Sequence, residues 1–226
     1  STCRSCSTLS ARPRSKPATP ASSGGTVYAW GFNNSGQLGD GTTETNNVPT
    51  AVPGLSGVRG IAANGYHSLA ILSNGTVWGW GDNMFGQAGQ GPAQVAVVSP
   101  QQIPLPAPPR PVSVAAGYGT SYVRRDDGSV VSWGANQDGG LGRDFTGYTH
   151  VPGLVSLATP VSRLVTGPIN AFALTSDASL WAWGRNDGRS LGDGTFKMRP
   201  LPVKIAEAGL NWKAATPEFF PVSGPQ

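Results

Sequence analysis

The sequence has few charged residues, few sulfur or imidazole ligands and no long apolar run. Charged residues make up 12% of the 226 positions, and there are two cysteines and two histidines. Cys3 and Cys6 both precede the repeats described below, so no disulfide can hold the fold together, and a lone C-x-x-C offers too few ligands for structural zinc. No apolar run approaches the roughly 18 to 20 residues that cross a bilayer, so no membrane partner is expected. The chain opens with Ser1 rather than Met, and we expect a processed or truncated soluble protein.

Glycine, proline and tryptophan are abundant instead. The 32 Gly and 20 Pro residues argue against a helix-rich fold, because both residues are unfavourable in helix interiors. The chain also has seven Trp and a hydrophobic fraction of 38%, which is too much apolar mass for a disordered protein. The composition therefore predicts a folded, non-helical protein.

The formal charge of +4 comes from the N-terminal segment. Arg4, Arg12, Arg14 and Lys16 account for all of it, and the other twelve basic residues balance twelve acidic ones. A nucleic-acid surface needs several clustered cations, so no nucleic-acid partner is expected of the folded part. Residues 1–23 are rich in Ser and Thr and contain no acid, which indicates a flexible tail, either a disordered leader or the remnant of an organelle transit peptide.

A four-residue motif, W-G-x-N, occurs four times at a nearly fixed period. The Trp residues are 50, 53 and 50 residues apart, and eight residues after each Trp an apolar residue is followed by Gly. A fixed period of roughly 20 to 50 residues indicates stacked structural units. The motif positions are Trp30, Gly31 and Asn33; Trp80, Gly81 and Asn83; Trp133, Gly134 and Asn136; and Trp183, Gly184 and Asn186.

Each of the last three motifs follows a turn and an alternating strand pattern. Asn74-Gly75 and Asp127-Gly128 precede two of these strands, and both dipeptides favour hairpins because their backbones accept positive φ. We therefore expect an antiparallel meander in each unit. A unit of about 50 residues with several strands fits a β-propeller blade, in which Trp fills the wedge between blades and the following Gly lets the chain turn.

Taken together, W-G-x-N-x-x-x-x-L-G and the preceding G-x-x-H-x-x-A-L and x-x-G-x-V-W-x-W-G resemble the repeat of the regulator of chromosome condensation family, over roughly residues 24–215. The resemblance implies an all-β, seven-bladed propeller with antiparallel four-stranded blades. Members that resemble this chain to the same degree include a nucleotide exchange factor for a nuclear Ras-like GTPase, ubiquitin-ligase accessory domains, organellar assembly factors and a secreted bacterial β-lactamase inhibitor. The motif is therefore much less specific for function than for fold.

The sequence contains about three and a half such blades. Ala18 to Ser22, 50 residues before the strand expected at 68–72, has no strand pattern, whereas residues 202–215 align with residues 49–62 and the match ends at Pro217. Three arrangements remain open: part of a longer propeller, a homodimer of two half-rings, and a four-bladed ring closed by the C-terminal strands. We expect a flexible tail at 1–23, repeats at 24–65, 66–117, 118–167 and 168–215, and a C-terminal tail at 216–226.

The sequence shows no recognisable catalytic, cofactor or metal site. His67 stands where the family repeat commonly has His, so we expect a structural hydrogen bond, and His150 has no nearby Cys or nucleophile elbow. Asp40 and Asp193 follow the apolar-Gly pair at the same phase, which indicates turn capping rather than a metal loop. No G-x-x-x-x-G-K phosphate loop is present. We therefore expect no enzymatic activity, no cofactor and no metal.

Residues that differ between repeats are the candidates for partner binding. Met84 and Phe85 are large and apolar where the other repeats are polar or small, so they either anchor a protein contact or compensate for Ala88 in place of Leu. The Pro-rich segment Gln90–Pro111 is expected to be irregular, extended and exposed, as a recognition segment or as a linker. The candidate partner-binding residues are Asn34, Met84, Phe85, Leu105, Arg110, Asp138 and Arg189.

The function we expect is that of a noncatalytic protein-interaction scaffold that presents blade-rim loops to a protein partner. The resemblance implies two alternatives, guanine nucleotide exchange on a Ras-like GTPase and inhibition of a secreted enzyme. The compartment stays open between an organelle, from the tail composition, and secretion by a bacterium, since the regular stretch Gly36–Thr42 resembles bacterial surface or secreted versions of the repeat.

Overall fold

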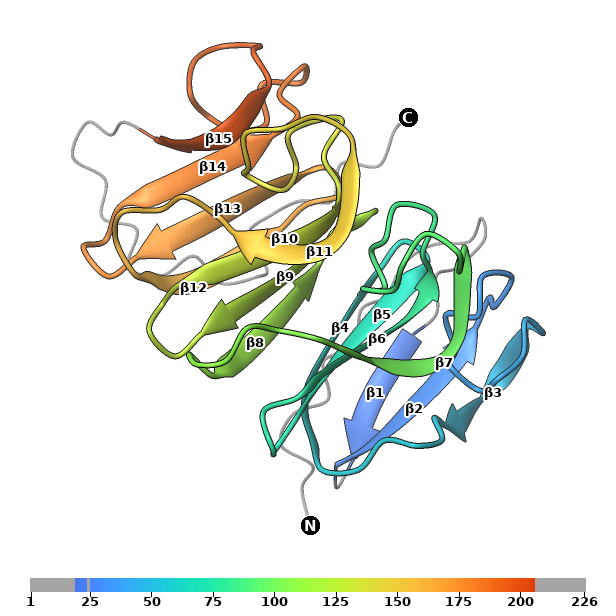
Figure 1. The fold of residues 1–226 in the computed structure, drawn as a ribbon. Helices are drawn as coiled ribbons and strands as arrows, with labels where there is room; N and C mark the ends of the chain where they lie inside the picture. Colours follow the sequence, from blue (N-terminus) through green and yellow to red (C-terminus); the bar gives the residue numbers. More distant parts are fainter. Residues whose placement is uncertain (1–18, 24, 206–226) are drawn as a thin grey trace.

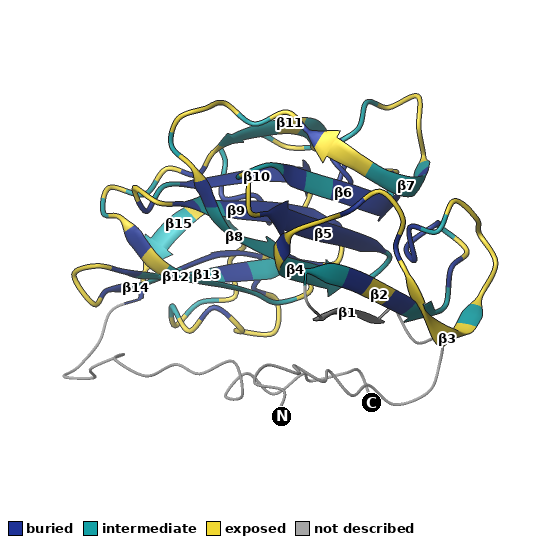
Figure 2. Cartoon of the chain, turned by 90° about the horizontal axis from the view of Figure 1, so that it is seen from below, coloured by how far each residue is buried: buried dark blue, intermediate teal, exposed yellow. Residues whose placement is uncertain are grey.

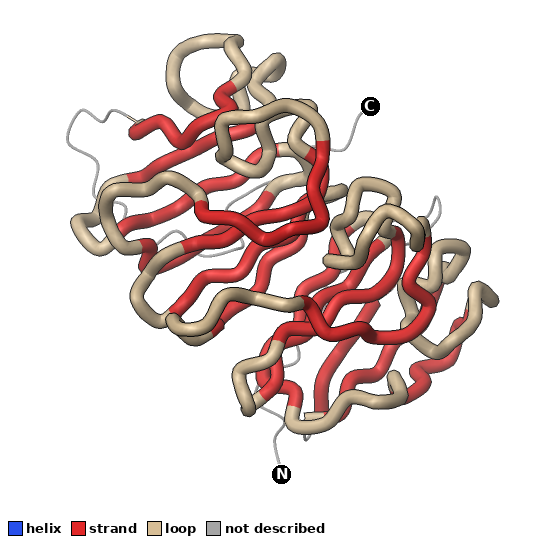
Figure 3. Tube along the Cα trace, viewed as in Figure 1, coloured by secondary structure: helices blue, strands red, loops and turns tan. Residues whose placement is uncertain are grey.

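The computed structural model describes residues 19–23 and 25–205 as strands joined by loops (Figure 1, Figure 3). The strands make one three-stranded and three four-stranded antiparallel sheets. These residues contain no helix that is long and apolar enough to span a membrane. The all-β architecture of antiparallel sheets that the resemblance implies is confirmed, with four strands in three of the four described sheets.

Each sheet is a meander in which neighbours in the sheet are also neighbours in sequence. The sheets are numbered here from the N-terminus. The first holds β1 (Thr19–Ser23), β2 (Thr26–Gly31) and β3 (Asn46–Ala51); the second β4 (Val58–Asn64), β5 (His67–Leu72), β6 (Val77–Asp82) and β7 (Ala96–Ile103); the third β8 (Pro111–Ala116), β9 (Thr120–Arg125), β10 (Val130–Ala135) and β11 (Tyr148–Leu154); the fourth β12 (Val161–Thr166), β13 (Asn170–Thr175), β14 (Leu180–Gly184) and β15 (Arg199–Lys204).

The Gly of each W-G pair follows a β-bulge at the Trp. Pairing between β6 and β7 shifts register between Gly79 and Gly81, across Trp80, and the same shift occurs at the other three Trp residues. Gly81 has a φ of +99°, and a Cβ there would collide with the carbonyl oxygen of Tyr66. Glycine is needed because it fits both the backbone conformation and the close approach.

The expectation that residues 18–22 carry no strand was wrong. β1 (Thr19–Ser23) pairs with β2 in continuous antiparallel register, from Thr19 opposite Trp30 to Ser23 opposite Thr26. The pairing uses backbone groups and therefore needs no alternation of apolar side chains. An open edge of β2 would leave a row of N–H and C=O groups unpaired, and β1 satisfies them despite its unfavourable sequence pattern.

The sheets are offset from the repeat units expected from the sequence. β4 (Val58–Asn64) lies inside the expected unit 24–65 but is the first strand of the second sheet, and β8 and β12 are displaced in the same way. Each of the first three sequence units therefore begins in one sheet and ends in the next. Residues 206–215, at the end of the expected unit 168–215, lie outside the described residues.

The Pro-rich segment Gln90–Pro111 was expected to be irregular, but part of it forms a strand. It contains β7 (Ala96–Ile103), which pairs with β6 from Val77 opposite Ile103 to Asp82 opposite Ala96. Pro100 is tolerated because β7 is the outer strand of its sheet and needs a hydrogen-bonded neighbour on one side only. Pro104, Pro106, Pro108 and Pro109 lie in the connection to β8, and Pro111 is the first residue of that strand.

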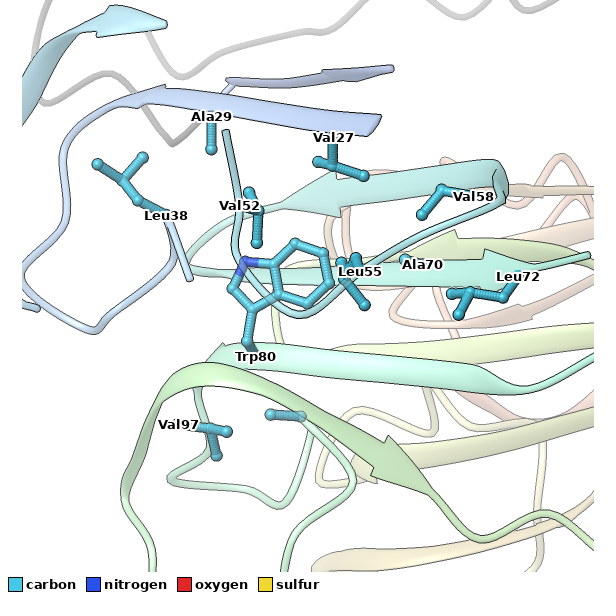
Figure 4. Packing of buried hydrophobic residues seen from close by; sticks show 11 residues of the cluster. Val27, Ala29, Leu38, Val52, Leu55, Val58, Ala70, Leu72, Trp80 and Val97 are labelled. Carbon is cyan, nitrogen blue, oxygen red and sulfur yellow. The ribbon is translucent and has the colours of Figure 1, made fainter. Parts of the chain in front are cut away.

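Three indole rings fill the junctions between successive sheets. In Figure 4, Trp80 of β6 points toward Val52 and Leu55, which follow the first sheet in the chain. Figure 2 shows the buried positions running along the central strands. Trp30 is only half-buried, because the described residues provide no sheet on the side of the first sheet that Trp30 faces. Trp80, Trp133 and Trp183 are fully buried, and each Nε1–H donates a hydrogen bond of 3.0 Å to a carbonyl that follows the preceding sheet's W-G-x-N motif, at Gln37, Gln87 and Gly140 respectively.

Candidate functional site

The long loops that follow the W-G-x-N motifs all lie at the same end of the sheets, which we call the loop face. They comprise residues 32–45, 83–95, 136–147 and 185–198. The short turns 65–66, 117–119 and 167–169 lie at the same end, because the strands that follow them pair with the ends of β6, β10 and β14. Neighbouring loops and strands touch here: the Gly86 backbone lies against His150 of β11. Segments about 50 residues apart in sequence therefore form one surface.

The Asn of each motif ties its loop together from within. Asn136 is buried, and its Oδ1 accepts a hydrogen bond of 2.9 Å from the Leu141 N–H, while its Nδ2 donates to the Arg143 carbonyl at 3.0 Å. The other three motif Asn residues bond to the N–H five residues ahead in the same way. The recurrence of Asn was visible in the sequence, but its function in holding the loop was not. These loops are preorganised rather than free to rearrange.

Asp40 and Asp193 cap turns, as the sequence predicts. Each carboxylate accepts a 2.9 Å hydrogen bond from the N–H two residues ahead, at Thr42 and Thr195. Asp193 also accepts a 2.7 Å bond from Nε of Arg199. Desolvation raises the pKa of Asp193, but the hydrogen bonds from Thr195 and Arg199 outweigh it and hold that pKa well below its ordinary value.

His67 is buried at the junction of the second and third sheets. Its Nε2 lies 2.9 Å from Oγ of Ser121, and that hydroxyl donates to the Gln87 carbonyl at 2.7 Å. Burial lowers the pKa of His67 to about 4, so the ring is neutral at pH 7. Nδ1 has no hydrogen-bond partner among the described residues. The geometry is that of a side chain that links two sheets rather than of a general base facing substrate.

Large apolar side chains gather on the loop face around the second and third sheets. Met84 is 63% exposed, and the Phe85 ring lies 6.3 Å from the ring of Tyr148, which is itself 58% exposed. Three further rings form a row from Phe32 through Tyr66 to Tyr118. The ring centroids of Phe32 and Tyr66 are 6.1 Å apart, and those of Tyr66 and Tyr118 are 5.9 Å apart. We call this set the aromatic surface: Phe32, Tyr66, Met84, Phe85, Tyr118 and Tyr148.

The aromatic surface was found only in part from the sequence. Met84 and Phe85 were predicted as partner-binding residues, whereas Tyr66 and Tyr118, each of which follows a Gly before a strand, were not. Phe85 packs toward Tyr148 and Gly119 of the third sheet, while Ala88 lies in the Trp80 cluster with the first sheet. This direction argues against the alternative that Phe85 compensates for Ala88.

The remaining predicted residues separate into two groups. Asn34, Asp138 and Arg189 are exposed on the loop face, and the Arg189 guanidinium lies 4.0 Å from the ring centroid of Phe196. Leu105 and Arg110 lie beyond the far end of β7, at the opposite face. Leu105 packs on the core between the second and third sheets, and the Arg110 N–H donates to Asp126 at 3.1 Å. They do not join the other five in one site.

Comparison with known proteins identifies the repeats. The regulator of chromosome condensation (RCC1) repeat matches residues 24–71 and 74–123, and a second description of the same repeat matches 58–87 and 112–139. The chain is 30% identical over 193 residues to the ultraviolet-B receptor UVR8 of Arabidopsis thaliana, covering 83% of this chain and 43% of the receptor. It is 32% identical over 180 residues to the human E3 ubiquitin-protein ligase HERC2, covering 77% of this chain and 4% of the ligase.

Two solved structures show the same fold. Human WBSCR16 is similar with a TM-score of 0.72 at 25% identity, over 81% of this chain and 49% of that one. Yeast RCC1 (Prp20), solved with Kap60, is similar with a TM-score of 0.73 at 22% identity, over 81% and 45%. The chain thus spans half or less of the length of the relatives it matches.

Proposed function

Because this chain belongs to the regulator of chromosome condensation repeat family and adopts its propeller sheets, we propose that it is a noncatalytic scaffold whose loop face binds a protein partner. The relatives include an ultraviolet-B receptor and an E3 ubiquitin-protein ligase, so the shared repeat does not by itself specify one activity. The proposal therefore depends on the surface of this chain.

The observation that carries the proposal is the exposure of the aromatic surface. Met84 in a loop, Tyr118 in a turn and Tyr148 at the start of β11 are 63%, 51% and 58% exposed. Aromatic residues and Met are enriched at protein interfaces, where they supply large buried area, and clustered apolar side chains on a surface mark interaction sites. Scattered single apolar residues would not support the same inference.

The hydrogen bonds within the loops, which we call the loop clamps, support binding of a partner without rearrangement of the loop face. Each motif Asn accepts a hydrogen bond from the N–H five residues ahead and donates to a carbonyl farther along its loop, and the carboxylates of Asp40 and Asp193 accept hydrogen bonds that fix two of the turns. A surface held in one conformation loses little entropy when a partner docks. Nucleotide exchange and enzyme inhibition would both need such a surface, but no feature of the described residues favours either over simple docking.

Affinity capture with matched variants tests the proposal. The double variant Met84→Ser/Tyr148→Ser removes apolar area from the loop face, and Leu154→Ser is the control, because Leu154 is 60% exposed at the opposite end of β11. Thermal unfolding establishes that both variants fold. We expect the double variant to lose partners that the wild type and the control retain. Capture of the same partners by all three proteins would refute the proposal.

A further inference from the structure

Three aromatic rings from successive parts of the propeller form a continuous row. Phe32 follows β2, Tyr66 lies in the turn between β4 and β5, and Tyr118 lies in the turn between β8 and β9. Phe32 and Tyr66 are tilted by 59°, and Tyr66 and Tyr118 meet nearly edge to face at 77°. Tyr118 is 51% exposed, so the row ends in a ring that is open to solvent.

A carboxylate lies beside this row. Asp82, half-buried, ends β6, and its backbone N–H donates a 2.8 Å hydrogen bond to the Tyr66 carbonyl. Partial burial raises the pKa of Tyr118, and the neighbouring Tyr66 and the Asp82 charge raise it further. Asp82 Oδ1 accepts a 3.0 Å hydrogen bond from the Met84 N–H. A carboxylate has about four acceptor positions, so most of its capacity remains.

No basic side chain of the described residues neutralises Asp82. The ion pairs among the described residues join Arg185 to Asp187 and Arg199 to Asp193, and neither includes Asp82. The contrast with other rings of the loop face is informative. Arg143 lies 5.0 Å from the ring centroid of Phe145, and Arg189 covers Phe196. Those two rings thus have a cation from within the chain, whereas the described residues supply none for the row that ends at Tyr118.

From this juxtaposition we propose that the partner places a Lys or Arg side chain against the Tyr66 and Tyr118 rings and the Asp82 carboxylate. The inference rests on the proposed function and names the chemistry of the partner. Aromatic faces and a carboxylate both attract a cation. An apolar partner would instead bury Asp82 without a counter-charge, which is unfavourable.

The combination of the two Tyr rings with a carboxylate at the position of Asp82 occurs only once among the described repeats. At the position of Asp82 the other motifs have Phe32, Ala135 and Arg185, and the fourth sheet has Pro168 where Tyr66 and Tyr118 occur. Scaffold requirements would recur with the repeat, as Trp and Asn do. A feature confined to one junction is therefore better explained by a ligand.

The test uses the ¹⁵N-labelled full chain and the peptide Ac-Gly-Arg-Gly-NH2, with its citrulline analogue as a neutral probe of the same shape. We expect amide shifts at Tyr66, Asp82 and Tyr118, and roughly three- to tenfold tighter binding of the arginine peptide. Asp82→Asn and Tyr118→Ala should abolish this preference. The control Asp138→Asn, which removes an exposed carboxylate of the same face, should not. Tyr118→Phe keeps the ring and should retain binding.

Equal affinity for the two peptides would overturn the proposal, and so would an equal loss in Asp82→Asn and Asp138→Asn, since that indicates unspecific attraction to acid. Partner capture separates this proposal from the proposed function. Capture that depends on Met84 and Tyr148 but is unchanged by Asp82→Asn and Tyr118→Ala would refute the cation site and leave the scaffold. If the chain prefers the arginine peptide but captures no protein whose binding is lost in the Met84→Ser/Tyr148→Ser variant, the cation site is supported and the scaffold is refuted.

Discussion

The three junctions between sheets differ from the two ends of the described chain, although the same motif builds both. At each junction a fully buried indole donates to a carbonyl across the interface. At the N-terminal end Trp30 is half-buried, and at the C-terminal end Ser190, which corresponds to Gln37 and Gln87, has a carbonyl that no indole of the described residues reaches. The motif specifies an interaction between neighbours, and its energetic contribution depends on whether the neighbour is present.

A glycine position shows the same contrast. A Cβ at Gly36, Gly86 or Gly139 would lie 2.7 Å from a backbone atom of the next sheet's outer strand. The corresponding residue of the fourth sheet is Arg189, which keeps a positive φ of +56° and carries a full side chain. Glycine is required where another sheet packs closely, and the last described sheet escapes this requirement.

Removing one indole from a junction and one from an end tests the comparison most strongly. Trp133→Ala should lower the free energy of unfolding by about 3 to 5 kcal/mol, because it leaves a large cavity and removes one of the two hydrogen bonds that the Gln87 carbonyl accepts. Trp30→Ala should cost roughly 1 kcal/mol, since its ring is already partly solvated. Equilibrium denaturation with urea measures both. Equal losses would contradict the distinction between junctions and ends.

Acid should weaken one junction more than the others. His67 has a folded pKa of about 4 against an ordinary value of 6.5, so the unfolded chain binds a proton first as the pH falls. Its contribution is present above pH 6.5 and is lost on going down to pH 4, a change of about 3 kcal/mol. The equivalent residue of the third sheet is Thr120, which does not titrate.

The check is urea denaturation at pH 7 and pH 4.5 for the wild type and for His67→Gln, which keeps a hydrogen-bonding group near Ser121. The wild type should lose more stability than the variant between these pH values. Parallel losses in the two proteins would exclude His67 as the source.

The glycine contrast predicts a smaller asymmetry. Gly86→Ala should destabilise the chain by about 2 to 3 kcal/mol, because it adds strain at φ +79° and a clash with the His150 backbone. Arg189→Gly should change stability by less than about 1 kcal/mol, since relief of backbone strain offsets the lost contact with Phe196. Thermal unfolding of both variants gives the comparison, and a neutral Gly86→Ala would show that the junction can relax.

The loop clamp supplies the most local effect. Asn136→Ala should cost about 2 kcal/mol, because several buried backbone groups lose their partner. Asn34→Ala is the matched control and should stay within about 0.5 kcal/mol, since Asn34 is exposed. Amide hydrogen exchange should quicken in loop 136–147 only for Asn136→Ala. Unchanged exchange there would mean that the loop is held by other contacts.

The sequence predicted the parts of the fold that depend on local pattern and repetition. W-G-x-N spacing predicted antiparallel sheets with Trp between them, and the phase of Asp40 and Asp193 predicted turn caps. It failed for β1 and β7, where backbone pairing with an open neighbour outweighed a poor side-chain pattern.

Most of the candidate site could not be predicted, because it is formed between repeats. The row of Phe32, Tyr66 and Tyr118 comes from three parts of the chain that only the stacking of sheets brings together. Leu105 was predicted as a contact residue but packs inward, since a Pro-rich composition does not reveal which side chain faces the core. The sequence shows that Arg189 differs from the residues at the same repeat position, Gly36, Gly86 and Gly139. Only the packing distances show that those glycines are required by a neighbouring sheet, whereas Arg189 is not so constrained.

The indole-to-carbonyl bond also gives the propeller a polarity. One side of every junction offers a donor and the other an acceptor, so the surfaces that meet are different from each other. Two first sheets cannot pair by this bond, because both present an indole, and two last sheets both present a carbonyl. Through this bond a first sheet pairs with a last sheet and not with another first sheet, so sheets join head to tail, as in heterologous assemblies.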